Sequence, residues 1–215
     1  MVNRNTALKI RKVHRYLGLF IGIQFLFWTI SGLYFSWTNI DEIHGDQFKN
    51  LNYVPKSFTN LISPSQIETK EDIQSIELRD IGNQPYYWVN NSQLYNAIDG
   101  TPKDGITSSE ALYIAKNHMI SGLEVDSIYK IYQVNKHHEY REKFLPAYVI
   151  SYKNNDALKA YVSIKDGQFQ TVRHRNWRWF DFLWMTHTMD YEGRDNFNTT
   201  LLRAFSLLGL NVKWL

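Results

Sequence analysis

The chain contains no cysteine among its 215 residues. This absence excludes disulfides, thiol catalysis, iron–sulfur clusters and cysteine-ligated zinc sites. The sequence also lacks a nucleophile elbow, an H-E-x-x-H zinc motif, a phosphate-binding glycine loop and a dinucleotide fingerprint. A formal net charge of only +3 gives no basis for nucleic-acid binding. Enzymatic activity is therefore not expected, although the composition by itself does not exclude it.

The composition is that of a chain able to build a hydrophobic core. Hydrophobic residues make up 44% of the sequence and charged residues 21%, which is unlike a disordered tail. The length suits one ordinary domain, or one domain with a membrane anchor.

The N-terminal 40 residues hold five basic side chains and no acidic one. Residues 17–37 (LGLFIGIQFLFWTISGLYFSW) carry no charge, and as a helix they span about 31 Å, the thickness of a bilayer's hydrocarbon core. A cleaved signal peptide would have a shorter apolar region followed by small residues in an A-x-A-like arrangement. We therefore expect a cytoplasmic N-terminus (1–16), an uncleaved transmembrane helix (17–37) and an exported remainder.

Small side chains recur along the apolar stretch at steps of three and four residues, which places them on one helix face. We expect this face to pack against another membrane helix, either of a second protein or of a homo-oligomer, because small residues let helix backbones approach closely. The residues of this small-residue face are Gly18, Gly22, Thr29, Gly32 and Ser36.

The segment 38–176 alternates between helix and strand patterns. A capping box at 63–66 predicts a short helix ending near residue 72, and strand patterns follow at 74–81, 85–90 and 93–98. A second capping box at 107–110 opens a helix, followed by strand patterns at 125–134, 144–153, 157–164 and up to 172. Helix followed by strands, twice, predicts an α+β module of two helix-plus-antiparallel-sheet units.

Four segments resemble the PepSY-associated transmembrane proteins. They are 11–19 (RKVHRYLGL), 106–111 (ITSSEA), 145–167 with its LPAY and LKAYV runs, and 184–190 (WMTHTMD). The resemblance implies a membrane-anchored protein of the bacterial inner membrane with tandem PepSY-like units on the periplasmic side. It also implies a second membrane helix after His187.

The C-terminal segment 177–215 begins with dense aromatic residues, which are typical of a membrane–water interface. We expect Trp37, Trp177, Trp179 and Trp184 to lie at that interface, in contact with membrane lipids. The apolar run 197–210 contains Arg203 and is followed by Lys213, so it is short for a span. An interfacial or half-inserted helix is therefore favoured over a full crossing.

Haem-binding relatives in this family use histidines near membrane helices, and His14 and His187 are the matching positions. The resemblance thus implies a b-type haem as the alternative to a protein without a cofactor. If 17–37 spans the membrane, the two histidines lie about 30 Å apart, and one haem cannot be ligated by both. Each would need a partner from another chain or from His44.

The favoured function is that of a non-catalytic binding or accessory subunit of a membrane complex, or a regulator of an exported partner. Two alternatives remain open. One is a b-type haem redox protein related to siderophore-iron reductases. The other is a peptidase-inhibitory module, which rests on an analogy with protease propeptides and hence on the fold alone.

Overall fold

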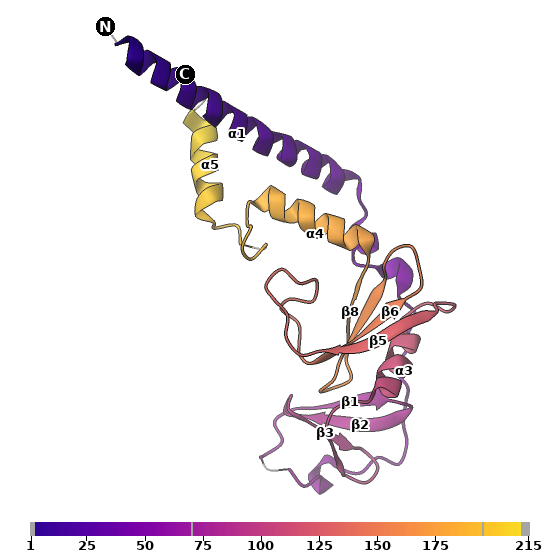
Figure 1. Cartoon of the computed structure of the whole chain (residues 1–215). Helices are drawn as coiled ribbons and strands as arrows, with labels where there is room; N and C mark the ends of the chain where they lie inside the picture. The colour runs from indigo at the N-terminus through magenta and orange to yellow at the C-terminus, as the bar shows by residue number, and fades with distance from the viewer. Residues whose placement is uncertain (1–2, 70, 195, 212–215) are drawn as a thin grey trace. The chain divides into compact units, whose positions relative to one another are not determined.

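The computed structural model describes residues 3–69, 71–194 and 196–211 and shows an α+β protein (Figure 1). The chain divides into two compact units. The helical unit comprises Met1–Asn39 with Arg178–Leu215, and the sheet unit comprises Ile40–Trp177.

The helical unit contains the long helix α1 (Arg4–Trp37) and the helix α5 (Thr200–Asn211). It also contains α4 (Arg175–Thr188) from Arg178 onwards. The Asn3 side chain caps α1 by accepting a hydrogen bond from the Asn5 amide at 3.2 Å. Among the described residues, α1 is the one helix long and apolar enough to cross a membrane. This property fits either a membrane anchor or a signal sequence. The helix ends at Trp37, as the sequence predicts, but it begins well before residue 17.

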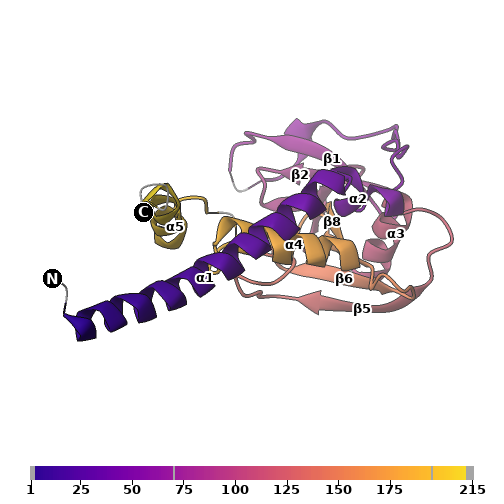
Figure 2. The same ribbon diagram turned by 90° about the horizontal axis from the view of Figure 1, so that it is seen from above.

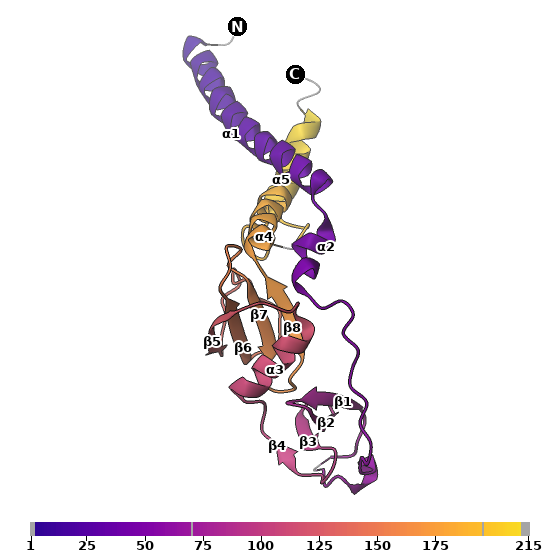
Figure 3. The same ribbon diagram turned by 90° about the vertical axis from the view of Figure 1, so that its right-hand side faces the viewer.

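The sheet unit opens with the short helices α2 (Ile40–Ile43), η1 (Asp46–Phe48) and η2 (Pro64–Gln66). The first antiparallel sheet has the order β1-β2-β3-β4, with bounds Ile76–Ile81, Gln84–Val89, Gln93–Asn96 and Pro102–Lys103. The helix α3 (Ser108–His118) follows. The second antiparallel sheet has the order β5-β6-β7-β8, with bounds Val125–Ile131, Ala147–Tyr152, Lys159–Ser163 and Phe169–Arg173. Figures 2 and 3 show these strands from two further sides.

Side chains alternate along the strands of the first sheet, so its two faces pack in two different hydrophobic clusters. The cross-strand pair Trp88 and Leu94 packs with α3, whereas Tyr87 and Tyr95 pack on the opposite face. That opposite face is covered by apolar residues of the segment 61–73.

The helix predicted over 63–72 is therefore wrong beyond its first turn. The capping box forms, with Ser63 N donating to Gln66 Oε1 at 3.0 Å, but only the 3-10 turn η2 follows. The chain around it runs extended, and Ile62 N donates to Ala97 O at 2.9 Å. The extended course lets Ile62 and Ile67 reach the sheet, so packing overrides the local helix signal.

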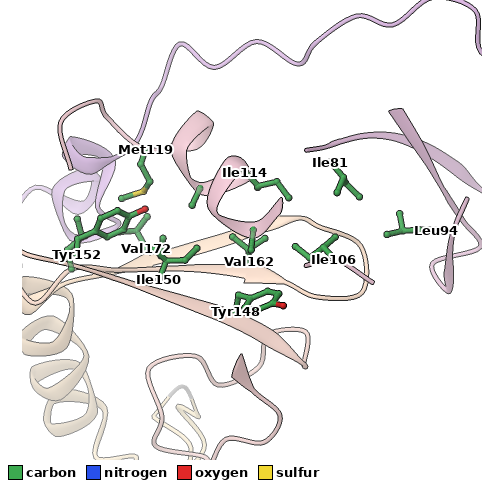
Figure 4. Close-up of a cluster of buried hydrophobic side chains, with 14 of the residues drawn as sticks. Ile81, Leu94, Ile106, Ile114, Met119, Tyr148, Ile150, Tyr152, Val162 and Val172 are labelled. Atoms are coloured by element: carbon green, nitrogen blue, oxygen red, sulfur yellow. The ribbon is translucent and has the colours of Figure 1, made fainter. Parts of the chain in front are cut away.

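The second capping box opens α3 as predicted. Thr107 and Glu110 exchange hydrogen bonds, with Thr107 N donating to Glu110 Oε2 at 2.7 Å. Helix α3 packs on β6, β7 and β8 and also touches β1. Figure 4 shows the result: Ile114 of α3 lies among Ile81 and Leu94 of the first sheet and Ile150 and Val162 of the second. One hydrophobic core thus joins the two sheets.

The other face of the second sheet is covered by the loop that follows β5. Tyr140 of this loop is fully buried and stacks on Tyr161 of β7, with ring centroids 4.6 Å apart. Glu139 accepts a hydrogen bond from Tyr161 Oη at 2.6 Å and pairs with Lys159 Nζ at 3.2 Å. The loop is therefore a packed cover of the sheet.

Two C-terminal helices complete the chain. The aromatic stretch that the sequence suggests as an interfacial segment forms α4, and the apolar run after it forms α5. Lys213 lies outside the described residues.

Replacement of the fully buried Leu94 by alanine should lower the free energy of unfolding by about 2–5 kcal/mol, because it removes apolar contacts and leaves a cavity. The matched change Leu51→Ala, at a side chain that is 70% exposed, should change it by less than about 0.5 kcal/mol. Denaturant unfolding of the full chain in mild detergent measures both. Equal losses would show that Leu94 is not part of a cooperative core.

Candidate functional site

One face of α1 is occupied by the other helices of the helical unit. Gln24, Trp28, Ser31 and Phe35 follow one another at steps of four, three and four, so they lie on a single stripe. Gln24 and Ser31 are the buried residues of α1. We refer to these four residues as the packing face.

Two residues of the packing face donate hydrogen bonds to the C-terminal end of α4. Gln24 Nε2 donates to the Thr186 carbonyl at 3.0 Å, and Trp28 Nε1 donates to the His187 carbonyl at 2.6 Å. These carbonyls belong to the last turn of α4, where no intrahelical partner exists. The side chains of α1 therefore cap α4.

The His187 ring lies between aromatic neighbours of α1. Its centroid is 5.6 Å from that of Trp28 and 5.5 Å from that of Phe35. The Ser31 hydroxyl donates to the Phe27 carbonyl at 2.7 Å, so its oxygen is left to accept from His187 Nδ1, 2.8 Å away. His187 is thus held in one orientation by α1.

The turn after α4 is organised by a buried carboxylate. Asp190 accepts hydrogen bonds from the amides of Gly193 (3.0 Å) and Asn196 (2.8 Å). Asp181 of α4 pairs with Arg194 of the same turn. This arrangement sets the course of the chain towards α5, where Phe205 contacts Trp28 with ring centroids 5.4 Å apart.

The small-residue face of α1 is distinct from the packing face. Three of the four packing-face residues are followed directly by a residue of the small-residue face, as in Trp28 and Thr29 or Ser31 and Gly32, and successive residues are about 100° apart around a helix. A Cβ added at Gly18, Gly22 or Gly32 would meet no atom of the described residues within 4 Å. This chain therefore leaves the small-residue face uncovered at those glycines.

The two candidate haem ligands do not meet. His187 lies beside Ser31, and His14 precedes Ser31 by 17 positions on the same helix, which corresponds to about 26 Å along its axis. His44 belongs to the sheet unit. His14 and His187 of the helical unit therefore do not ligate the same haem, as the sequence predicts, and either would need a second histidine from elsewhere.

The four tryptophans assigned to a membrane interface have different surroundings. Trp37 and Trp179 are 84% and 57% exposed, whereas Trp184 packs on Phe35 with centroids 5.7 Å apart. Trp177 belongs to the sheet unit, where the Arg173 guanidinium lies 4.0 Å from its ring centroid. Trp37 and Trp179 are the ones exposed enough to contact lipid extensively.

Among the described residues, no three histidine, aspartate or glutamate side chains are grouped so as to hold a metal ion. In the sheet unit, the half-buried His118 contacts two aromatic rings. It lies between Tyr53 and Phe169, with ring centroids 4.1 and 4.9 Å away. Burial lowers the pKa of His118, although its contact with the Ile114 carbonyl and the charge of Asp80 act in the opposite direction.

A cleft of about 840 Å³ adjoins this stack in the sheet unit. Its lining includes Tyr53, Asp80, Tyr113 and Lys116. Tyr113 Oη donates to Asp80 Oδ2 at 3.0 Å, and Oδ1 of the same carboxylate is buried with no hydrogen-bond partner in the described part of the chain. Burial raises the pKa of Tyr113, and the neighbouring Asp80 adds to this increase. The lining of the cleft thus combines a carboxylate, two phenols and an ammonium group.

Sequence reasoning identified the small-residue face but not the packing face. A signal for the latter was present: Gln24 and Ser31 are polar residues seven positions apart in an apolar helix, and such residues usually face a protein partner. The His118 stack had no comparable signal, because its rings come from three distant segments.

Comparison with protein-family models, with curated proteins and with solved structures gave no match to this chain.

Acidification should destabilise the protein through His118. Because burial lowers the pKa of this histidine below its ordinary value of 6.5, the unfolded chain takes up the proton more readily than the folded chain. The free energy of unfolding should therefore fall as the pH drops below about 6.5. His118→Phe should make this decline shallower between pH 7 and pH 5, whereas Tyr53→Phe, which removes no group titrating there, should not. Thermal melts across this range test it, and identical slopes in all three proteins would contradict it.

Proposed function

We propose that this chain is a membrane-anchored, non-catalytic accessory protein of the PepSY type. Helix α1 anchors it in the bacterial inner membrane and binds a transmembrane helix of a partner, while the sheet unit lies on the periplasmic side. The observation that carries this proposal is the division of α1 into two faces: one is occupied by α4 and α5, and the glycines of the other are uncovered.

The anchor is supported by length and charge. Helix α1 has 34 residues, and its five basic residues all precede the uncharged stretch 17–37. Basic residues are retained on the cytoplasmic side of a membrane, which orients the N-terminus inward and the residues after α1 outward. Most large apolar side chains of the stretch are exposed, as expected of a surface that faces lipid.

A partner helix is supported by the chemistry of the uncovered face. In a bilayer, helices gain little from hiding apolar surface, since lipid is equally apolar, and they associate through close van der Waals contact. Gly18 and Gly22 form a G-x-x-x-G pair that permits such an approach. Leu19 and Ile23 directly follow Gly18 and Gly22, so their bulky side chains project about 100° away from the glycines. Both are exposed, as expected of side chains that contact lipid.

The sheet unit supports the PepSY assignment. Two antiparallel sheets follow in sequence, and the capped α3 packs on the second. Its polar cleft and strand edges offer binding surfaces, which is what an accessory or regulatory role requires.

The topology is testable with single cysteines, because the natural chain has none. A cysteine at Asn91, in the exposed turn between β2 and β3, should react with a membrane-impermeant maleimide on intact spheroplasts. A cysteine at Thr6 should react only after the membrane is permeabilised. The opposite pattern would contradict the orientation, and loss of the N-terminal residues from the mature chain would indicate a signal sequence.

The helix contact is testable with a photo-cross-linking side chain in native membranes. Placed at Thr29, it should give a discrete protein adduct, and placed at Ile30, on the lipid side, it should not. Gly22→Leu should reduce the Thr29 adduct at least tenfold by preventing close approach, whereas Ile23→Phe should leave it unchanged. The mass of the adduct separates a second copy from another protein. Lipid adducts alone at both positions would overturn the proposed contact.

A further inference from the structure

Strand β5 forms an open edge of the second sheet. Among the described strands it pairs with β6 alone, and Figure 2 shows it as the outermost strand of that sheet. Its residues are exposed except Ile128 and Ile131, which are half-buried. An edge strand presents unpaired backbone N–H and C=O groups, which can pair with another strand.

The charges of β5 are arranged symmetrically. Asp126 and Lys130 lie two positions before and two positions after Ile128. If β5 pairs antiparallel with another β5 about Ile128, Asp126 lies opposite the partner's Lys130, and Lys130 lies opposite the partner's Asp126. Cross-strand pairs of opposite charge stabilise a sheet, and pairs of like charge destabilise it.

We propose that β5 pairs with β5 of a second copy of this chain, antiparallel and in the register centred on Ile128. The two four-stranded sheets then form one continuous eight-stranded sheet across a two-fold axis. Such an isologous contact uses the same patch on both subunits and closes at the dimer. The proposal does not depend on which helix packs against the small-residue face of α1.

Charge complementarity favours a second copy over an unrelated strand. Charged residues on an edge usually discourage pairing, because a random partner places no opposite charge against them. Self-pairing about Ile128 matches both charges at once. In the part of the chain that the structure describes, Asp126 takes part in no ion pair, and Lys130 Nζ lies over the Tyr148 ring, 5.3 Å from its centroid.

The register is also limited by the strand itself. The ladder to β6 is regular from Ser127 to Ile131 and irregular between Val125 and Ser127. The regular part therefore includes Ser127, Ile128, Tyr129 and Lys130, the centre of the proposed contact, whereas Asp126 lies at the irregularity next to it. A contact of this length is small, so we expect it to form when both copies are held in one membrane, where confinement raises their effective concentration.

The register is tested by disulfide formation in the full-length, membrane-embedded protein. Ser127 lies opposite the partner's Tyr129, so Ser127→Cys and Tyr129→Cys chains with different tags are co-expressed and oxidised. Because directly opposed residues are close enough for a disulfide and diagonal ones are not, the mixed pair should cross-link at least fivefold more than either variant alone. Both positions are exposed, so the substitutions leave the core intact.

The charge pattern is tested in the same cross-linking pair. Lys130→Asp or Asp126→Lys, made in both copies, should reduce the cross-link at least fivefold, and the two changes together should restore it. Lys136→Asp, at an exposed loop position, is the matched control and should have no effect. The proposal is overturned if the mixed pair does not cross-link, if each variant cross-links equally well alone, or if the double reversal fails to restore the signal.

Discussion

The hydrogen bonds that Gln24 and Trp28 donate to the last carbonyls of α4 determine the arrangement of the helical unit. A helix end surrounded by apolar groups must find partners for its free carbonyls, and α1 supplies them. These bonds fix which face of α1 is occupied. They also place His187 against Ser31 and bring Phe205 of α5 to Trp28. Because α4 and α5 pack on this face, the glycines of the small-residue face stay uncovered.

A different constraint shapes the sheet unit, where each sheet has packed segments on both faces, although most of β5 is exposed. Segment 61–73 and the loop bearing Tyr140 cover the outer faces, and α3 packs in the core that joins the sheets. Among the described residues, the open edge of β5 and the cleft beside Asp80 are two surfaces available for recognition. This distribution suits a protein that binds other chains.

The chemistry suggested by residue type alone was less informative than the residues' surroundings. His187 has a defined set of neighbours, with Ser31 at its Nδ1 and Trp28 and Phe35 beside its ring, which its position in the sequence did not predict. The tryptophans likewise differ: Trp177 lies against the Arg173 guanidinium and Trp184 against Phe35, whereas Trp37 and Trp179 are exposed.

The sequence by itself determined the features that depend on near neighbours in the chain. These are the helix over the uncharged stretch 17–37, the capping box of α3, the alternating strands and the small-residue face, because periodicity and caps act over a few residues. Only the tertiary structure decided that the helix predicted over 63–72 stops after the turn Pro64–Gln66, that α4 is a helix capped by α1, and that Tyr53 and Phe169 enclose His118. These outcomes depend on contacts between residues far apart in sequence, which no local pattern encodes.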